Sequence, residues 1–355
     1  MKLSRRNFLK IAFFSAAAAA LFANFGWKSN ATSKKNSQDW NPAYSKLEKK
    51  GKLKTKIEEA YEKMRRCSLC PHRCGVNRLK GERGFCRASA NAAIASYNPH
   101  FGEEVPLVGR NGSGTIFFSN CNLRCVFCQN WPIAHEGRGR QVTDKQIAEI
   151  MLILQRRGCH NINLVTPTHF MPNVIAAARM AHKEGLRIPL CYNTGGYELV
   201  ENIKLLDGIV DIYLPDLKFM DGKQADKYVF TGAHDYPKNA QESIIEMHRQ
   251  VGDLVTDENN IALRGVILRH LVMPNHVSGA REFVKWVAKN LSTETYVNIM
   301  SQYRVEHKAY EYEKIARAVN YQEFSEALNW AKEAGLANLD ERSSSRLERF
   351  RRMFH

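Results

Sequence analysis

The sequence lacks several features that would place it in common protein classes. Its main apolar run, residues 11–25, is shorter than the ~20 residues that a membrane-spanning helix needs. It has no internal repeat, and no glycine-rich phosphate loop follows its first expected strand, which disfavours a nicotinamide-dependent enzyme. Hydrophobic residues at 44% and charged residues at 25% are ordinary for a globular protein, so extensive disorder and a multi-span membrane protein are both disfavoured.

Positive charge is concentrated at the N-terminus. Residues 1–66 hold 16 Lys or Arg and 5 acids, a net charge of +11, and the remaining 36 bases and 31 acids give +5. The body of the chain has no long Lys/Arg run and no basic stripe interleaved with aromatic residues. Binding to nucleic acid is therefore weakly supported, and modification of a nucleic acid is kept as a third alternative.

The N-terminus has the pattern of a targeting segment. SRRNFLK at residues 4–10 is followed by the apolar run and then by Ser29-Asn30-Ala31, a small-x-small cleavage site. We expect residues 1–31 to be a twin-arginine signal peptide that sends the protein to the periplasm. An uncleaved signal would anchor it to the membrane, and an unused signal would leave it in the cytoplasm.

The rest of the chain divides into four expected parts. A Lys-, Ser- and Asn-rich linker with a short helix near residues 57–66 is followed by a cysteine-rich module and a βα core, and a basic tail ends the chain. The expected boundaries are 32–66, 67–110, 111–335 and 336–355.

Short apolar runs alternate with longer amphipathic runs through the core, which predicts an α/β fold. The expected strands are 115–119, 161–165, 188–192, 210–214, 263–269 and 295–300. The expected helices are 144–157, 172–184, 198–206, 238–251, 278–289 and 309–333. Six βα units form either an open sheet or a barrel, and both place their functional residues at the carboxyl ends of the strands.

Three cysteines follow the first of these strands within eight residues. Cys121, Cys125 and Cys128 supply three thiolates, whereas a four-iron cubane has four irons to ligate, so one iron stays open for a cofactor or substrate. A three-cysteine zinc site is the alternative, and His135 is its candidate fourth ligand.

A second group, Cys67, Cys70, Cys74 and Cys86, can close a metal site completely. A second [4Fe-4S] cluster is favoured over a four-cysteine zinc site, and disulfides come third. The two isolated cysteines, Cys159 and Cys191, are expected in the core.

The loop CNLRCVFC at residues 121–128 resembles the C-x3-C-x2-C loop of the radical S-adenosylmethionine (SAM) superfamily. Over roughly residues 65–335 the chain is most similar to the branch related to pyruvate formate-lyase activating enzymes. The segments that carry the resemblance are 67–74, 112–130, 161–169, 192–198, 211–219 and 269–275. It implies a partial (β/α)6 TIM-like barrel with a small N-terminal cysteine-rich module.

The resemblance also implies a [4Fe-4S] cluster whose free iron binds SAM, and it implies residues that contact this cofactor. Phe127 matches an adenine-contacting aromatic residue, with a core position as the alternative. Thr166-Pro167-Thr168-His169 stands where many relatives have Gly-Gly-Glu, so threonine oxygens replace that acceptor, while His169 is equally compatible with a structural role. Lys218 and Arg269 match positions that can pair with the methionine carboxylate, with surface salt bridges as the alternative. The full set of expected cofactor contacts is Phe127, Thr168, Asn193, Thr194, Asp216, Lys218, Arg269 and Gln302.

The expected function is a radical SAM oxidoreductase. It cleaves SAM reductively to a 5′-deoxyadenosyl radical that abstracts hydrogen, in the manner of an activator of a glycyl radical enzyme. The alternatives are radical SAM modification of another protein or a small molecule and, from another class, a non-catalytic iron–sulfur electron carrier. A low-potential electron donor and a protein substrate are the expected partners.

Overall fold

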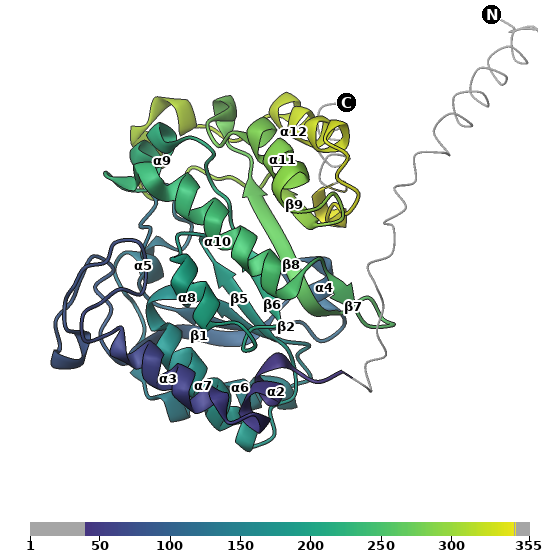
Figure 1. Ribbon diagram of the computed structural model, residues 1–355. Coiled ribbons are helices and arrows are strands. Elements are labelled where there is room, and N and C mark those ends of the chain that lie inside the picture. Colours follow the sequence, from purple (N-terminus) through teal and green to yellow (C-terminus); the bar gives the residue numbers. More distant parts are fainter. Residues whose placement is uncertain (1–39, 344, 346–355) are drawn as a thin grey trace, which may run out of the picture. The chain divides into compact units, whose positions relative to one another are not determined.

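The computed structural model describes residues 40–343 and residue 345, which are built around a nine-stranded sheet (Figure 1). The expected signal peptide, residues 1–31, and the last ten residues of the expected tail lie outside the described residues. In the described part of the chain, no helix is long and apolar enough to cross a membrane.

Six parallel strands form the centre of the sheet. In hydrogen-bonded order they are β2 (Ser113–Phe118), β4 (Ile162–Val165), β5 (Leu190–Thr194), β6 (Ile212–Pro215), β8 (Ala262–Leu271) and β9 (Tyr296–Met300). Their residues are mostly buried, as expected for parallel strands with both faces covered. This arrangement confirms the α/β class and the partial barrel with six parallel strands.

Three further strands are antiparallel and were not among the expected elements. β1 (Ala92–His100) pairs with β2 and with β3 (Arg140–Val142), and the two-residue β7 (Val255–Thr256) pairs with β8. Because β1 belongs to the same sheet as the core, the expected module boundary at residue 110 is wrong. The chain joins the core from residue 92 onward.

The main helices pack around the sheet (Figure 1). They are α6 (Asp144–Arg156), α7 (Met171–Lys183), α8 (Val200–Leu205), α9 (Gly222–Tyr228), α10 (Tyr236–Val251) and α11 (Ala280–Asn290). Thr143 and Gln146 form a capping box that fixes the start of α6. The expected linker also contains two helices, α2 (Ala43–Lys49) and α3 (Lys52–Glu62), which pack on α7.

The barrel interior is filled by a short segment that precedes β2. Leu107, in α4 (Val105–Val108), packs with Cys191, Ile212 and Ile267 in a small separate core. The amide of Asn161 donates to the carbonyl of Leu107 at 2.9 Å, which ties the segment to the start of β4. The residues just before α4 are thereby directed into the barrel.

The C-terminal part differs from the expected single helix over residues 309–333. Two 3-10 turns, Ala309–Glu311 and Glu313–Ile315, precede α12 (Tyr321–Glu333). Asn320 caps α12 in a capping box with Glu323, and this local signal sets the later start of the helix.

The expected tail boundary at residue 336 also needs correction. Leu339 forms a parallel bridge with Val297 of β9, and the fully buried Asp340 accepts a hydrogen bond from the Tyr296 hydroxyl at 2.9 Å. The chain is therefore part of the packed core up to residue 343.

Candidate active site

The three-cysteine loop follows β2 directly, and its backbone is held on both sides. The amide of Asn120 donates to the Ile133 carbonyl at 2.9 Å, and the Ser119 hydroxyl donates to the Arg138 carbonyl at 2.7 Å. Asn120 and Arg124 have positive φ angles of 70° and 61°, so the chain turns sharply at both positions. The loop therefore has a defined path at the carboxyl end of the first parallel strand.

The thiols of this loop lie close enough to affect one another electrostatically. Burial first, and then the neighbouring Cys121, raise the pKa of Cys128 to about 11. Burial also raises the pKa of Cys125, while the nearby ammonium of Lys218 acts to lower it. The sulfur of Cys121 accepts a hydrogen bond from the Leu123 amide at 3.3 Å. Mutual proximity, an amide donor and an adjacent cation are what a set of cluster-binding thiolates requires.

In the described residues, no three His, Cys, Asp or Glu side chains form a group that could hold a single metal ion. A four-iron cluster differs from a single ion because each thiolate binds a different iron. The cysteine loop therefore fits a cluster in donor type and in number, with one iron left for another ligand.

Four of the expected cofactor contacts meet at the strand ends beside the loop. Arg269 donates from Nε to Asp216 Oδ1 at 2.7 Å and from a terminal nitrogen to Asn193 Oδ1 at 2.7 Å. Lys218 Nζ lies 2.5 Å from the other oxygen of Asp216. Both ion pairs are largely buried, so the alternative of surface salt bridges is wrong.

The charges of this group reinforce one another. Burial acts to raise the pKa of Asp216, but Arg269 and Lys218 outweigh it and hold the pKa below its usual value. Burial acts to lower the pKa of Lys218 and of Arg269, and nearby negative groups, Asp216 first among them, raise both. The carboxylate and the two cations are therefore all ionised at neutral pH. The arrangement presents positive charge beside Cys125, which suits a carboxylate-bearing ligand.

A pair of glycines lets the β5 loop approach these residues. A Cβ on Gly195 would lie 2.5 Å from a methyl group of Leu123 in the cysteine loop, and one on Gly196 would lie 2.3 Å from the Asp216 carbonyl. The Tyr236 hydroxyl donates to the Gly195 carbonyl and accepts from the Lys218 amide, both at 2.9 Å. The glycines therefore permit the contact, and Tyr236 of α10 fixes it.

Thr168 and Thr194 are engaged elsewhere. Both hydroxyls donate to Glu198 Oε1 at 2.6 Å, and Glu198 is 1% exposed. Burial raises the pKa of Glu198 to about 7. Since Asn193 and Thr194 are successive strand residues, their side chains point to opposite faces of the sheet. The two threonines thus join β4 and β5 through Glu198, on the face opposite the Asn193–Arg269 contact.

This raised pKa gives a stability prediction for Glu198→Gln. The ordinary pKa of Glu is 4.5 and the folded-state pKa is about 7, so between these values the folded protein binds more protons and its stability falls as pH rises. Glutamine resembles the protonated acid and does not titrate. We expect the free energy of unfolding of the variant, relative to that of the parent, to rise by up to about 3 kcal/mol between about pH 5 and about pH 8. Urea unfolding at the two pH values measures this difference.

Glu242→Gln is the matched control, because Glu242 is exposed on α10. It should leave the pH dependence of unfolding unchanged. A Glu198→Gln variant whose pH dependence equals that of the parent would show that Glu198 is ionised in the folded protein throughout this range.

The other two expected contacts are Phe127, within the cysteine loop, and Gln302, which contacts the residue after this loop. Phe127 is 6% exposed and packs edge-on against Phe219, with ring centroids 6.0 Å apart. The backbone carbonyl of Gln302 accepts from Gln129 Nε2 at 3.0 Å, which ties the end of β9 to the residue after Cys128. The ring of Phe127 occupies a core position, and its backbone lies in the cysteine loop.

Two acids that the sequence analysis missed also reach the site. Glu103 lies 3.6 Å from Arg269, and the buried Glu104 accepts from Asn298 Nδ2 at 2.8 Å. Burial raises the pKa of Glu104 to about 7, although Arg269 lowers it. They line a cavity of about 50 Å³ with Arg269 and Gln302. Their one signal in the sequence is a pair of acids directly before the apolar segment VPLV.

The N-terminal cysteine group forms a second cluster of thiols. Burial raises the pKa of Cys70 and of Cys86, and the other cysteines of the group raise both further. The nearby Arg78 acts in the opposite direction and lowers the pKa of Cys86. A Cβ on Gly84 would lie 2.6 Å from the sulfur of Cys74, which also accepts from the Phe85 amide at 3.4 Å. The backbone thus wraps closely around a sulfur atom. All nine cysteines of the chain are free, so no disulfide is formed.

A buried arginine joins this module to the strand ends. Arg78 is 1% exposed and donates to the carbonyl of His169 at 2.6 Å and to that of Ser89. His169 in turn donates from Nε2 to the carbonyl of Ser119, just before the cysteine loop, at 2.8 Å. Burial lowers the pKa of His169 to about 3, so it is neutral. His169 therefore connects the module to the end of β2.

Comparison with known proteins agrees with this site. Residues 115–254 match the family model of the radical SAM superfamily. The uncharacterized protein MJ0674 of Methanocaldococcus jannaschii is 36% identical over 294 residues, which cover 80% of this chain and 79% of that protein. The uncharacterized protein MJ0808 of the same organism is 28% identical over 172 residues, or 43% of this chain and about half (49%) of that protein.

Two solved structures are similar over part of the chain. The [FeFe]-hydrogenase maturase HydG is 12% identical with a TM-score of 0.44, and the alignment covers 62% of this chain and 49% of HydG. A radical SAM methyltransferase from Sphaerobacter thermophilus is 17% identical with a TM-score of 0.44, covering 63% of this chain and 64% of that one. The family match, the extended similarity to MJ0674 and the cysteine loop at the end of the first parallel strand together identify this chain as a member of the radical SAM superfamily.

Proposed function

We propose that this radical SAM enzyme acts on a protein, and that its 5′-deoxyadenosyl radical abstracts hydrogen from a backbone glycine of a glycyl radical enzyme. The observation that carries the radical-generating half is the buried group of Asp216, Lys218 and Arg269 beside Cys125. The protein substrate is supported by the resemblance of the motif segments to pyruvate formate-lyase activating enzymes. Radical SAM modification of another protein or of a small molecule is the second candidate and uses the same residues.

Cys121, Cys125 and Cys128 would hold the [4Fe-4S] cluster, which with SAM supplies the radical by one-electron reductive cleavage. Lys218 and Arg269 are placed to pair with the methionine carboxylate of SAM. Asn193 lies within the same hydrogen-bonded group and supplies a polar contact. In this proposal Thr168 and Thr194 act on SAM through their backbone, because both hydroxyls are bound to Glu198.

Phe127 and Gln302 complete the proposed cofactor contacts. Phe127 belongs to the cysteine loop and Gln302 is tied to the residue after it, and backbone groups at both positions are proposed to contact the nucleoside of SAM. The second cysteine group, Cys67, Cys70, Cys74 and Cys86, is proposed to hold a second [4Fe-4S] cluster in preference to the alternative zinc ion, because no three such side chains of the described residues form a site for a single ion. Its support is four thiols that influence one another and a backbone wrapped around Cys74.

The twin-arginine pattern supports export as part of this proposal. As generally understood, the pathway carries folded proteins with their cofactors inserted, which suits an iron–sulfur enzyme. An exported enzyme would then need a low-potential electron donor outside the cytoplasm. Fractionation of cells that express the full chain, with an Arg5→Lys/Arg6→Lys variant as control, tests the location.

Deuterium transfer tests the substrate. The anaerobically reconstituted enzyme is incubated with SAM, a reductant and extracts of host cells grown on dideuterated glycine with unlabelled serine supplied. We expect deuterium to be transferred to 5′-deoxyadenosine when the enzyme is incubated with the protein fraction of the extract. Transfer from the small-molecule fraction alone would contradict a protein substrate and favour the second candidate. Extract from cells grown with deuterated alanine is the matched control.

A further inference from the structure

One histidine links the segments that carry the two cysteine groups. His72 stands between Cys70 and Cys74 in the sequence, and its Nε2 donates to the carbonyl of Asn122 at 2.7 Å. Asn122 stands between Cys121 and Cys125. One hydrogen bond therefore joins the backbone of the three-cysteine loop to a side chain within the four-cysteine group.

The His72 ring is held in place by its neighbours. It stacks on Phe85, with centroids 3.8 Å apart and planes 21° apart, and it also contacts Phe230 at 4.7 Å. On the other side of the bond, Asn122 donates from Nδ2 to the carbonyl of Tyr197 at 2.8 Å. Since both partners are fixed by further contacts, the bridge is a feature of the packed structure.

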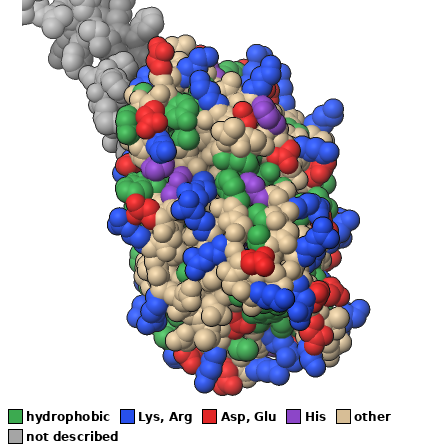
Figure 2. Space-filling model, turned by 90° about the vertical axis from the view of Figure 1, so that its left-hand side faces the viewer, with side chains coloured by type: hydrophobic (Ala, Val, Ile, Leu, Met, Phe, Trp, Pro, Cys, Tyr) green, Lys and Arg blue, Asp and Glu red, His purple; other side chains and the backbone are tan. Residues whose placement is uncertain are grey.

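The module that contributes His72 is strongly basic. Residues 63–87 contain eight Lys or Arg and one Glu, a net charge of +7. Within that segment the exposed cations are Arg65, Arg66, Arg73, Lys80, Arg83 and Arg87. Figure 2 views the side on which the module lies in Figure 1, and Lys and Arg side chains are spread over it.

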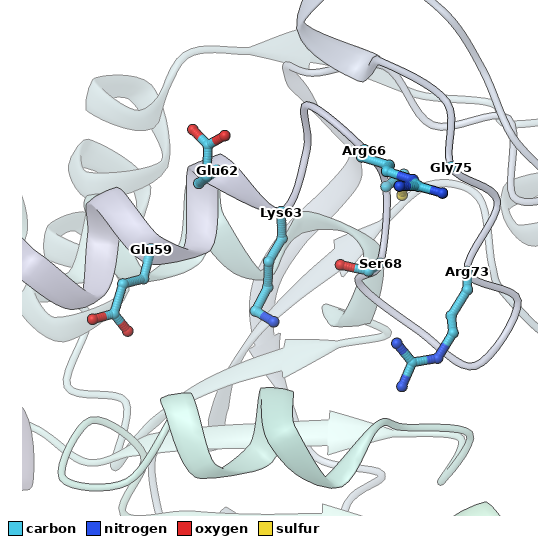
Figure 3. A pocket seen from close by; sticks show the side chains of 8 residues that line it. Glu59, Glu62, Lys63, Arg66, Ser68, Arg73 and Gly75 are labelled. Atoms are coloured by element: carbon cyan, nitrogen blue, oxygen red, sulfur yellow. The ribbon is translucent and has the colours of Figure 1, made fainter.

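An open cleft of about 760 Å³ leads to this cysteine group between α3 and the module. Lys63 and Arg73 point into its opening, and Cys67 is among the residues that line it (Figure 3). Glu59 and Glu62 of α3 lie along the other part of the cleft, and Arg65 pairs with Glu62 at 2.8 Å. Arg73 at the opening pairs with Glu201 at 2.5 Å, and Lys63 and Arg66 are the other cations that line the cleft beside Cys67.

We propose that electrons enter this enzyme at the N-terminal cysteine group from a small acidic electron-carrier protein, and that the His72–Asn122 bridge connects that group to the SAM-binding loop. The inference rests on the proposed second cluster. Cys67, Cys70, Cys74 and Cys86 would hold a cluster that can accept one electron from the carrier, and Cys121, Cys125 and Cys128 would hold the cluster that this electron finally serves. No proton moves, since His72 keeps its Nε2 hydrogen as a donor. His72 is a positioning residue in this scheme.

Rapid-freeze electron paramagnetic resonance tests the order of reduction. The full chain with both clusters is mixed with a reduced acidic ferredoxin, and each reduced cluster is followed by its signal. In the parent the N-terminal cluster should be reduced before the loop cluster. In His72→Phe, which keeps the stacking and removes the bridge, reduction of the loop cluster should slow several-fold while the first step is unchanged. His234→Phe, at an exposed histidine, is the control.

Charge reversal tests the docking face. Arg66→Glu/Arg83→Glu should slow the first reduction at least about tenfold, and added salt should narrow the difference. Lys285→Glu/Lys289→Glu, at two exposed positions on α11, should leave it unchanged. A neutral photoreductant should reduce both charge variants and the parent at the same rate. Equal ferredoxin rates in the two charge variants would overturn the docking face.

The failures of the two proposals are distinguishable. About 4 irons per chain, with one cluster signal, would remove the proposed second cluster and the inference with it. About 8 irons with the loop cluster reduced first, or with the parent rate in His72→Phe, would leave the second cluster in place and overturn the electron route.

Discussion

Alanine in place of Cys125 is expected to abolish formation of 5′-deoxyadenosine. Cys125 is 7% exposed, and its thiol is close enough to the Lys218 ammonium and to the other two loop thiols for them to shift its pKa. A methyl group cannot bind iron, and two remaining thiolates cannot retain a cubane that already has one open iron. The variant, reconstituted anaerobically and incubated with SAM and dithionite, should give no product above the enzyme-free background. Its iron content should fall by about 4 per chain.

Cys159→Ala is the matched control for this change. Cys159 is also buried, at 3% exposure, but belongs to neither cysteine group. It should keep its iron and its SAM cleavage. Product formation by Cys125→Ala at the rate of the control would contradict the assignment of the loop as the catalytic cluster site, whatever the iron content of the variant.

Much of the barrel could be predicted because its signals are local. Each parallel strand is a short apolar run followed by polar residues, and the carboxyl ends of parallel strands meet at one edge of a sheet. The resemblance implied Asn193, Asp216 and Arg269 as cofactor contacts, the rule predicts that their strand ends meet, and the structure places Arg269 within hydrogen-bond distance of the other two. The positions of the three loop cysteines followed from the same rule.

The rule could not assign faces at the strand ends. Thr194 is adjacent to Asn193, yet its hydroxyl is bound on the other side to Glu198, with Thr168. Alternation along a strand gives this result only when the register is known. Glu198 lies in a loop, where no periodicity marks a side chain as buried.

Long-range contacts were also beyond the sequence. Glu103 and Glu104 enter the barrel because the segment before β2 fills the interior, and no local pattern indicates such a path. The His72–Asn122 bridge joins residues 50 positions apart. The antiparallel strand β1 was missed because its apolar, buried residues end at residue 94. The rest of the strand, residues 95–100, is mostly polar and more exposed, so it shows no apolar run.

Asp216→Asn is expected to cause the largest loss of stability among single changes at the site. The carboxylate lies between two buried cations, with Arg269 Nε at 2.7 Å and Lys218 Nζ at 2.5 Å. Removing it leaves the buried Lys218 without its ion-pair partner and Arg269 with only its longer contact to Glu103, which costs about 3–5 kcal/mol. Because its folded-state pKa is lowered, the contribution of Asp216 is present above its ordinary pKa of 3.8 and is lost as pH falls below that value. Urea unfolding at neutral pH measures the loss.

Asp226→Asn is the control for Asp216→Asn, because it removes the carboxylate of a more exposed ion pair. Asp226 pairs with His234, whose side chain is 64% exposed, so this change should cost no more than about 1 kcal/mol. Equal losses in the two variants would contradict the buried network.

Removing a cation as well should recover part of the stability that Asp216→Asn loses. In Asp216→Asn/Lys218→Met the cation that lost its ion-pair partner is gone, while Arg269 keeps its bond to Asn193 and its contact with Glu103. The double variant should therefore unfold at higher urea than Asp216→Asn, and Lys218→Met alone should be less stable than the parent. Such coupling is the sign of a charge network and not of two independent side chains. If Lys218 also pairs with the SAM carboxylate, the double variant will regain stability while its KM for SAM stays raised, which separates the structural from the binding role of this lysine.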